Sequence, residues 1–155
     1  MNDGPVHDYL GASPGCWASF GALFNAGVPP TTGARWWPLV GDAYAVQHPG
    51  VPERRSIQSV GVHLLVLHAV LGRDAPVDQA LAIRRRALRS GERIAETLSW
   101  LDPPSGWPLN VDDVVTAPDA VERGRVADAY VESVWSEWDR RHGDTIARWG
   151  EALLG

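Results

Sequence analysis

The segment from Val60 to Leu71, VGVHLLVLHAVL, is apolar around the whole helical wheel except at two histidines, His63 and His68. A helix that is apolar on every side is normally buried in the middle of a fold. We therefore expect the other helices of the chain to surround this segment. The same placement carries the two titratable imidazoles into the protein interior.

Size and charge limit the classes of protein to consider. The 155 residues fit one domain with a core of ordinary size, and 45% of them are apolar, as in soluble globular proteins. The net charge of −5 argues against nucleic-acid and anionic-membrane partners. No apolar run approaches the roughly 20 residues that span a bilayer. The first residues lack the blocks of a signal peptide, and one cysteine forms no internal disulfide, so we expect a cytoplasmic protein.

Apolar residues recur at helical spacing along most of the chain, and no alternating strand pattern is present. The sequence predicts an all-α, single-domain bundle of four or more main helices. Residues 1–12 are expected to be an extended leader and residues 13–155 a single helical domain. The predicted helices are 15–26, 34 or 37 to 47, 55 or 56 to 72, 76–90, 92–100, 111–115, 118 to about 142, and 144–154.

Local signals mark where these helices begin and end. Asp74 and Asn110 are the expected N-caps of helices 76–90 and 111–115, and Gly143 is expected to interrupt the C-terminal helical region. Residues 101–110, LDPPSGWPLN, are predicted to be a loop rich in proline and tryptophan. In helix 76–90 the pattern assigns the apolar residues to the core and the arginines to solvent: Val77, Leu81, Ile83 and Leu88 inward, and Arg84, Arg85, Arg86 and Arg89 outward.

Polar side chains concentrate just before the central segment. Asp42, Tyr44, Gln47 and His48 fall within seven residues, and His48-Pro49 closes their helix. Tyr44 and His48 lie four residues apart and should share a helical face. We predict a catalytic site of Asp42, Tyr44, His48 and His63, in which Asp42 orients imidazoles that act as base, acid or metal ligand.

A metal centre is one form that this site could take. His48, His63 and His142 lie on helices expected to pack together, and three imidazoles with an open position can bind a divalent transition metal such as zinc. The alternative is that each imidazole is a buried side chain with a backbone or carboxylate partner. Cys16, in the first turn of a helix, is either a nucleophile or a small buried hydrophobe.

Eight tryptophans in 155 residues are the outlier of the composition. They are expected to fill the core or to line a pocket, because tryptophan buries a large area. The hypotheses for function are an enzyme acting on a small molecule in a Trp-lined pocket, a small-molecule binding protein, and a Trp-mediated module that forms homodimers. Arg54 and Arg55, just before the central helix, are either an anion site or exposed loop residues.

Three blocks of the chain resemble a known family. They are GPVHDYLGASPGCW (4–17), DAYAVQHPGVPERRSIQSVGVHL (42–64) and the segment from Trp135 to Trp149, with its W-x-x-W, H and W. They are similar to an uncharacterised bacterial domain, common in actinomycetes, whose members often begin with a zinc-ribbon Cys-x-x-Cys that this chain lacks. The resemblance implies a cytoplasmic domain of unknown function. It also draws attention to Asp42, Gln47, His48 and His63.

Overall fold

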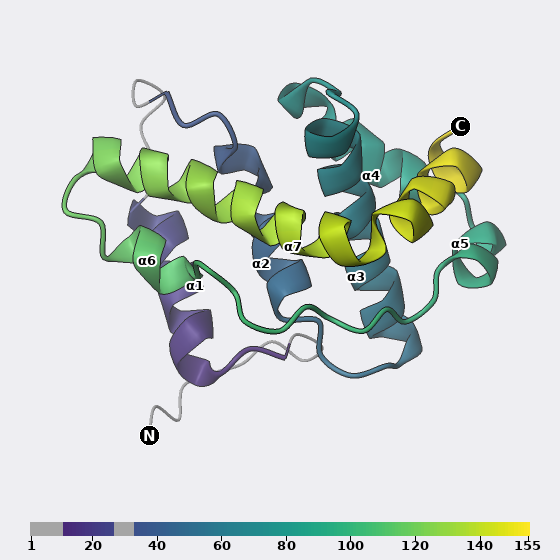
Figure 1. Cartoon of the computed structure of the whole chain (residues 1–155), viewed down its shortest axis with the longest axis horizontal. Coiled ribbons are helices and arrows are strands. Elements are labelled where there is room, and N and C mark those ends of the chain that lie inside the picture. Colours follow the sequence, from purple (N-terminus) through teal and green to yellow (C-terminus); the bar gives the residue numbers. More distant parts are fainter. Residues whose placement is uncertain (1–10, 27–32) are drawn as a thin grey trace.

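A computed structural model describes residues 11–26 and 33–155, which are mostly helical and contain no strand (Figure 1). The all-α prediction is confirmed for these residues. Most of the predicted leader lies outside them. The helices are α1 (Pro14–Ala26), α2 (Val40–Gln47), α3 (Arg54–Leu67), α4 (Ala80–Leu88), α5 (Glu92–Thr97), α6 (Val111–Val115) and α7 (Ala120–Leu154). Short 3₁₀ turns, Trp37–Leu39 and Val77–Gln79, precede α2 and α4, and a π turn, His68–Gly72, ends α3.

The long helix α7 crosses the whole molecule (Figure 1). It has 35 residues, or about 50 Å at 1.5 Å per residue. Its N-terminal half lies beside α2 and α6, with α1 packed on α6, and its C-terminal half lies beside α4 and α5. The central helix α3 contacts α2, α4, α5 and α7, as expected for a segment that is apolar all round.

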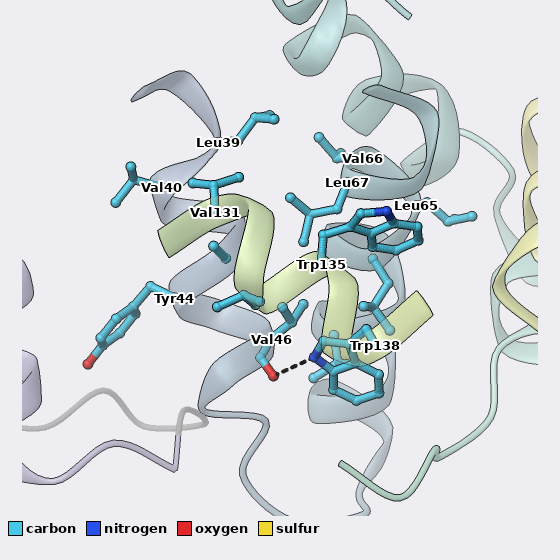
Figure 2. Packing of buried hydrophobic residues seen from close by; sticks show 14 of the residues in the cluster. Leu39, Val40, Tyr44, Val46, Leu65, Val66, Leu67, Val131, Trp135 and Trp138 are labelled. Atoms are coloured by element: carbon cyan, nitrogen blue, oxygen red, sulfur yellow. Dashed lines mark hydrogen bonds between the residues drawn. The ribbon is translucent and has the colours of Figure 1, made fainter. Parts of the chain in front are cut away.

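Buried aliphatic and aromatic side chains of α2, α3 and α7 form the core (Figure 2). Trp138 of α7 is fully buried, and its indole Nε1–H donates to the carbonyl of Val46 at 3.1 Å. The carboxylate of Asp128 on α7 accepts from the backbone N–H groups of Arg35 and Trp36 at 2.9 and 2.7 Å. These bonds fix the beginning of the α2 segment against α7, and so help to set the position of Asp42.

Several predicted helix ends are confirmed and two are wrong. His48 ends α2, and Asn110 caps α6 in a capping box with Asp113. Asp74 does not cap the next helix, because its φ of +57° places it in the left-handed turn that follows α3. Gly143 does not interrupt the C-terminal region. The cost of about 1 kcal/mol for a helical glycine is offset by burial of Ile146 on the following turn.

The inward face of α4 also differs from the prediction. Ala80 and Ala87 are its buried residues, whereas Leu81 and Leu88 are 52% and 46% exposed. Two small alanines let α4 approach α3 closely, and Arg84, between them on the same stripe, turns inward. No described helix is both long and apolar enough to cross a membrane.

Candidate functional site

A cleft of about 500 Å³ lies between α3 and α4. Its volume falls within the range of small-molecule sites. The wall from α3 consists of residues at helical spacing, which place them on one face. The lining residues are Arg55, Gln58, Ser59, Val62 and His63 from α3, and Arg84 and Leu88 from α4.

Asp42 of α2 contacts both walls of the cleft, through His63 of α3 and Arg84 of α4. Its side chain is fully buried, and its Oδ1 accepts from His63 Nδ1 at 2.7 Å and from Arg84 Nη2 at 2.8 Å. A buried carboxylate is tolerated where a charged donor compensates it, as Arg84 does here, and His63 adds a second hydrogen bond to the same oxygen. The other oxygen, Oδ2, is buried and has no partner among the described residues. Three helices therefore place one acid, one imidazole and one guanidinium in contact. The predicted contact between Asp42 and an imidazole is present at His63, and the role of Asp42 in orienting the ring stays a prediction.

The contact with Asp42 also decides how the His63 ring can act. An ionised carboxylate only accepts hydrogen bonds, so Nδ1 of His63 carries the proton that is shared with Asp42. In the neutral ring the other nitrogen, Nε2, then carries no proton and can accept a hydrogen bond. The His63 side chain keeps 23% of its surface exposed, and Asp42 keeps none. The imidazole is thus accessible while the group that orients it is not.

Arg84 is a residue of the cleft that the sequence interpretation missed, since the arginines of α4 were assigned to solvent. Its side chain is about one-third exposed: Nη2 donates to Asp42, and Nε is buried and has no partner within residues 11–26 and 33–155. A signal was present in the sequence, because Ala80, Arg84 and Ala87 share one stripe of α4. Small residues at positions i−4 and i+3 mark the face that packs against a neighbouring helix.

The lining of the cleft is cationic although the chain carries a net charge of −5, and one of its two guanidiniums, that of Arg84, is paired with Asp42. Arg55 and Arg84 line it, and none of its lining residues is acidic. Gln58 and Ser59 add neutral hydrogen-bonding groups. Guanidinium groups recognise planar anions such as carboxylates through paired hydrogen bonds, so the lining suits a small anion.

Tyr44 and His48 form a second cluster on the other side of α2. Positions 42 and 44 are separated by about 200° around a helix, so Tyr44 points away from the side that Asp42 faces. The Tyr44 ring packs against His48 and Phe20, with centroid distances of 4.5 and 4.0 Å. Figure 2 shows Tyr44 directed away from Trp135 and Trp138. The predicted Tyr44–His48 contact is present, but neither residue lines the cleft.

In this second cluster, burial shifts the pKa values of both Tyr44 and His48. Burial, and secondarily the nearby Cys16, raises the pKa of Tyr44 above its ordinary range. Burial lowers the pKa of His48. Among the residues that the structure describes, the buried Tyr44 hydroxyl and His48 Nε2 have no hydrogen-bond partner. Cys16 is half buried and packs against the core, which favours its interpretation as a hydrophobe.

His142 lies apart from both the cleft and the Tyr44–His48 cluster, beside Asp102. Its Nε2 is 2.7 Å from the carbonyl of Asp102, and its ring packs 5.7 Å from that of Trp138. The contact ties the proline-rich segment to α7. No group of three His, Cys, Asp or Glu that could hold a metal is found in ranges 11–26 and 33–155. The predicted metal centre of His48, His63 and His142 is therefore not formed, because the three rings have separate surroundings.

The sequence predicted a Trp-lined pocket, but no tryptophan lines this cleft. Trp36, Trp135, Trp138 and Trp149 are buried, and the other four are partly buried. These four keep part of their surface accessible, and a Trp-mediated homodimer stays a prediction.

Fold and cleft together define an all-α protein with an Asp–His–Arg cluster at a cationic cleft. Residues 4–139 match the model of a family of unknown function (DUF5946), and the chain belongs to that family. No curated protein and no solved structure matches the chain. The family assignment agrees with the resemblance to an uncharacterised domain, and the family description names no activity.

Proposed function

We propose that the protein is an enzyme that transfers a proton to or from a small anionic molecule held between α3 and α4. The observation that carries this proposal is the hydrogen bond from His63 Nδ1 to the buried carboxylate of Asp42 at the wall of a cationic cleft. Positioned imidazoles are the commonest general acids and bases of enzymes.

The roles of the residues follow from their contacts. His63 Nε2 is the proton-transferring atom, and Asp42 is a positioning residue that holds the ring and stabilises its charged form. Arg55 and Arg84 bind the anionic group of the ligand. Arg84 is held by Asp42, so its guanidinium is already oriented before the ligand arrives. Ser59 and Gln58 supply neutral hydrogen bonds.

The alternative from a different class is a binding protein that uses the same cleft without turnover. The cationic lining serves either function, because binding an anion needs Arg55 and Arg84 only. The hydrogen bond between Asp42 and His63 favours the enzyme, since a binding protein has no need of an imidazole oriented by a buried acid. The two functions are separated by their dependence on His63.

The proposal is tested by incubating the purified protein with a defined mixture of small carboxylates and phosphate monoesters and following each component by proton NMR. We expect one component to be consumed by the wild type. His63→Gln should slow this consumption by about 100-fold or more, the usual contribution of a general acid or base. His142→Gln, which removes an imidazole outside the cleft, is the matched control and should leave the rate within about twofold.

Binding is measured in parallel by isothermal titration calorimetry with acetate and inorganic phosphate. If an anion binds and binding is weakened by Arg55→Gln, yet no component is consumed, the protein is a non-catalytic binding protein. If neither anion binds, the proposed cleft chemistry is wrong.

A further inference from the structure

A second groove lies on the other side of Gln58, between α3 and α5. Its volume is about 480 Å³, and its lining residues are Arg54, Ile57, Gln58, Ile94, Ala95 and Leu98. Four of these six are apolar, in contrast with the cleft between α3 and α4. Ile94 and Leu98 are buried, and Ala95 is exposed at the edge of the groove.

The two grooves flank the same helix and share a wall. Gln58 lines both of them. Arg54 and Arg55, consecutive residues in the first turn of α3, point about 100° apart and reach one groove each. A ligand crossing Gln58 would therefore lie in a cationic cleft at one end and in an apolar groove at the other.

The depth of the apolar groove depends on Gly61. A Cβ at this position would lie 2.6 Å from Cδ1 of Leu98, closer than such contacts occur. The absence of a side chain lets Leu98 pack directly on the α3 backbone and form the base of the groove. With any larger residue at position 61, Leu98 would be displaced.

We propose that the two grooves form one site for an amphipathic carboxylate, with its head group at Arg55 and Arg84 and an unbranched apolar tail between α3 and α5. This inference rests on the proposed function for the position of the head group. Two guanidiniums, of Arg55 and Arg84, line the polar cleft, whereas the other groove has one, of Arg54, beside the apolar surface of Ile57, Ile94 and Leu98. The more cationic cleft therefore suits the head group, and the more apolar groove suits the tail. The substrate class is thus a medium-chain fatty acid or a molecule with that combination of groups.

The experiment measures dissociation constants for acetate, butanoate, hexanoate and octanoate by calorimetry. Each buried methylene should tighten binding by about fourfold once the tail reaches the groove. Ala95→Gln adds an uncharged polar side chain at the edge of the groove, so it should abolish the gain with chain length and leave acetate binding unchanged. Ala82→Gln, at an exposed position of α4 outside both grooves, is the matched control and should retain the gain.

Arg55→Gln separates the head-group site from the tail site. It should weaken binding of all four acids by a similar factor and retain the dependence on chain length. If acetate binds but affinity does not rise with chain length, or if it still rises in Ala95→Gln, the amphipathic site is refuted and the anion cleft stands. If none of the four acids binds, the carboxylate site itself is refuted. Circular dichroism of each variant establishes that the helices are intact.

Discussion

The buried carboxylate of Asp42 makes the stability of the fold depend on its cationic partner, Arg84. The Asp42 carboxylate is fully buried, and Arg84 is its cationic partner at 2.8 Å. Arg84→Gln should lower the free energy of unfolding by about 2 kcal/mol, less than the 3–5 kcal/mol for a fully buried pair because Arg84 is partly exposed. Urea unfolding at pH 7 measures the change. Arg85→Gln, at the neighbouring exposed position, is the control and should change stability by less than about 0.5 kcal/mol. Equal effects of the two substitutions would contradict the ion pair.

Two buried tyrosines of adjacent helices differ in one hydrogen bond. The Tyr130 hydroxyl donates to Gln47 Oε1 at 2.9 Å, whereas the buried Tyr44 hydroxyl has no partner in the described part of the chain. Tyr130→Phe should destabilise the protein by about 1–2 kcal/mol, because Gln47 loses its donor inside the core. Tyr44→Phe should be neutral or stabilising by up to about 1 kcal/mol, since the costly burial of a hydroxyl is removed. Thermal unfolding of both variants measures the two changes in stability. A larger destabilisation by Tyr44→Phe than by Tyr130→Phe would contradict these hydrogen-bond assignments.

At the scale of the helices, glycines at two positions should respond to alanine in opposite directions. At Gly143 of α7 a Cβ would meet only the carboxylate of Asp139, an exposed side chain that can rotate away. Gly143→Ala should therefore raise the free energy of unfolding by about 0.5–1 kcal/mol through helix propensity. Gly61→Ala on α3 should lower it by about 1–3 kcal/mol, because Leu98 is buried and has little room to move. Chemical unfolding tests both, and destabilisation by Gly143→Ala would mean that α7 needs a glycine there.

The order and the approximate ends of the helices could be predicted because their signals are local. The prolines at 14 and 49, the cap at Asn110 and the apolar spacing of α3 act within a few residues. The inward orientation of Arg84 could not be predicted from local signals, because it depends on how closely α3 and α4 approach each other. The separation of His48 from His63 depends likewise on which side of α2 each neighbouring helix occupies. Helix spacing indicates that Asp42 and Tyr44 diverge, but the identity of their partners is a tertiary property.

At the scale of the whole molecule, histidines buried in separate places link stability to pH. Burial lowers the pKa of His48, and burial together with the nearby Arg73 lowers that of His68 against the opposite effect of Asp139. In the unfolded chain both imidazoles take up a proton near pH 6.5, whereas in the folded protein they do so only at lower pH. The unfolded state therefore binds more protons below about pH 6.5. Stability is fully present above that pH and is lost as the pH falls toward the folded-state pKa values.

This linkage predicts a free energy of unfolding that falls between pH 7 and 5.5, measured by urea titration at several pH values. His48→Leu and His68→Leu should each reduce the difference between the two pH values, and the double variant should reduce it further. Lost packing lowers stability equally at both pH values, so the difference isolates the titration of the imidazoles from structural damage. A double variant with the same pH dependence as the wild type would show that other groups cause it. Both histidines lie outside the lining of the cleft, so their substitution should leave acetate binding at pH 7 unchanged. Stability and function would then depend on different imidazoles of the same fold.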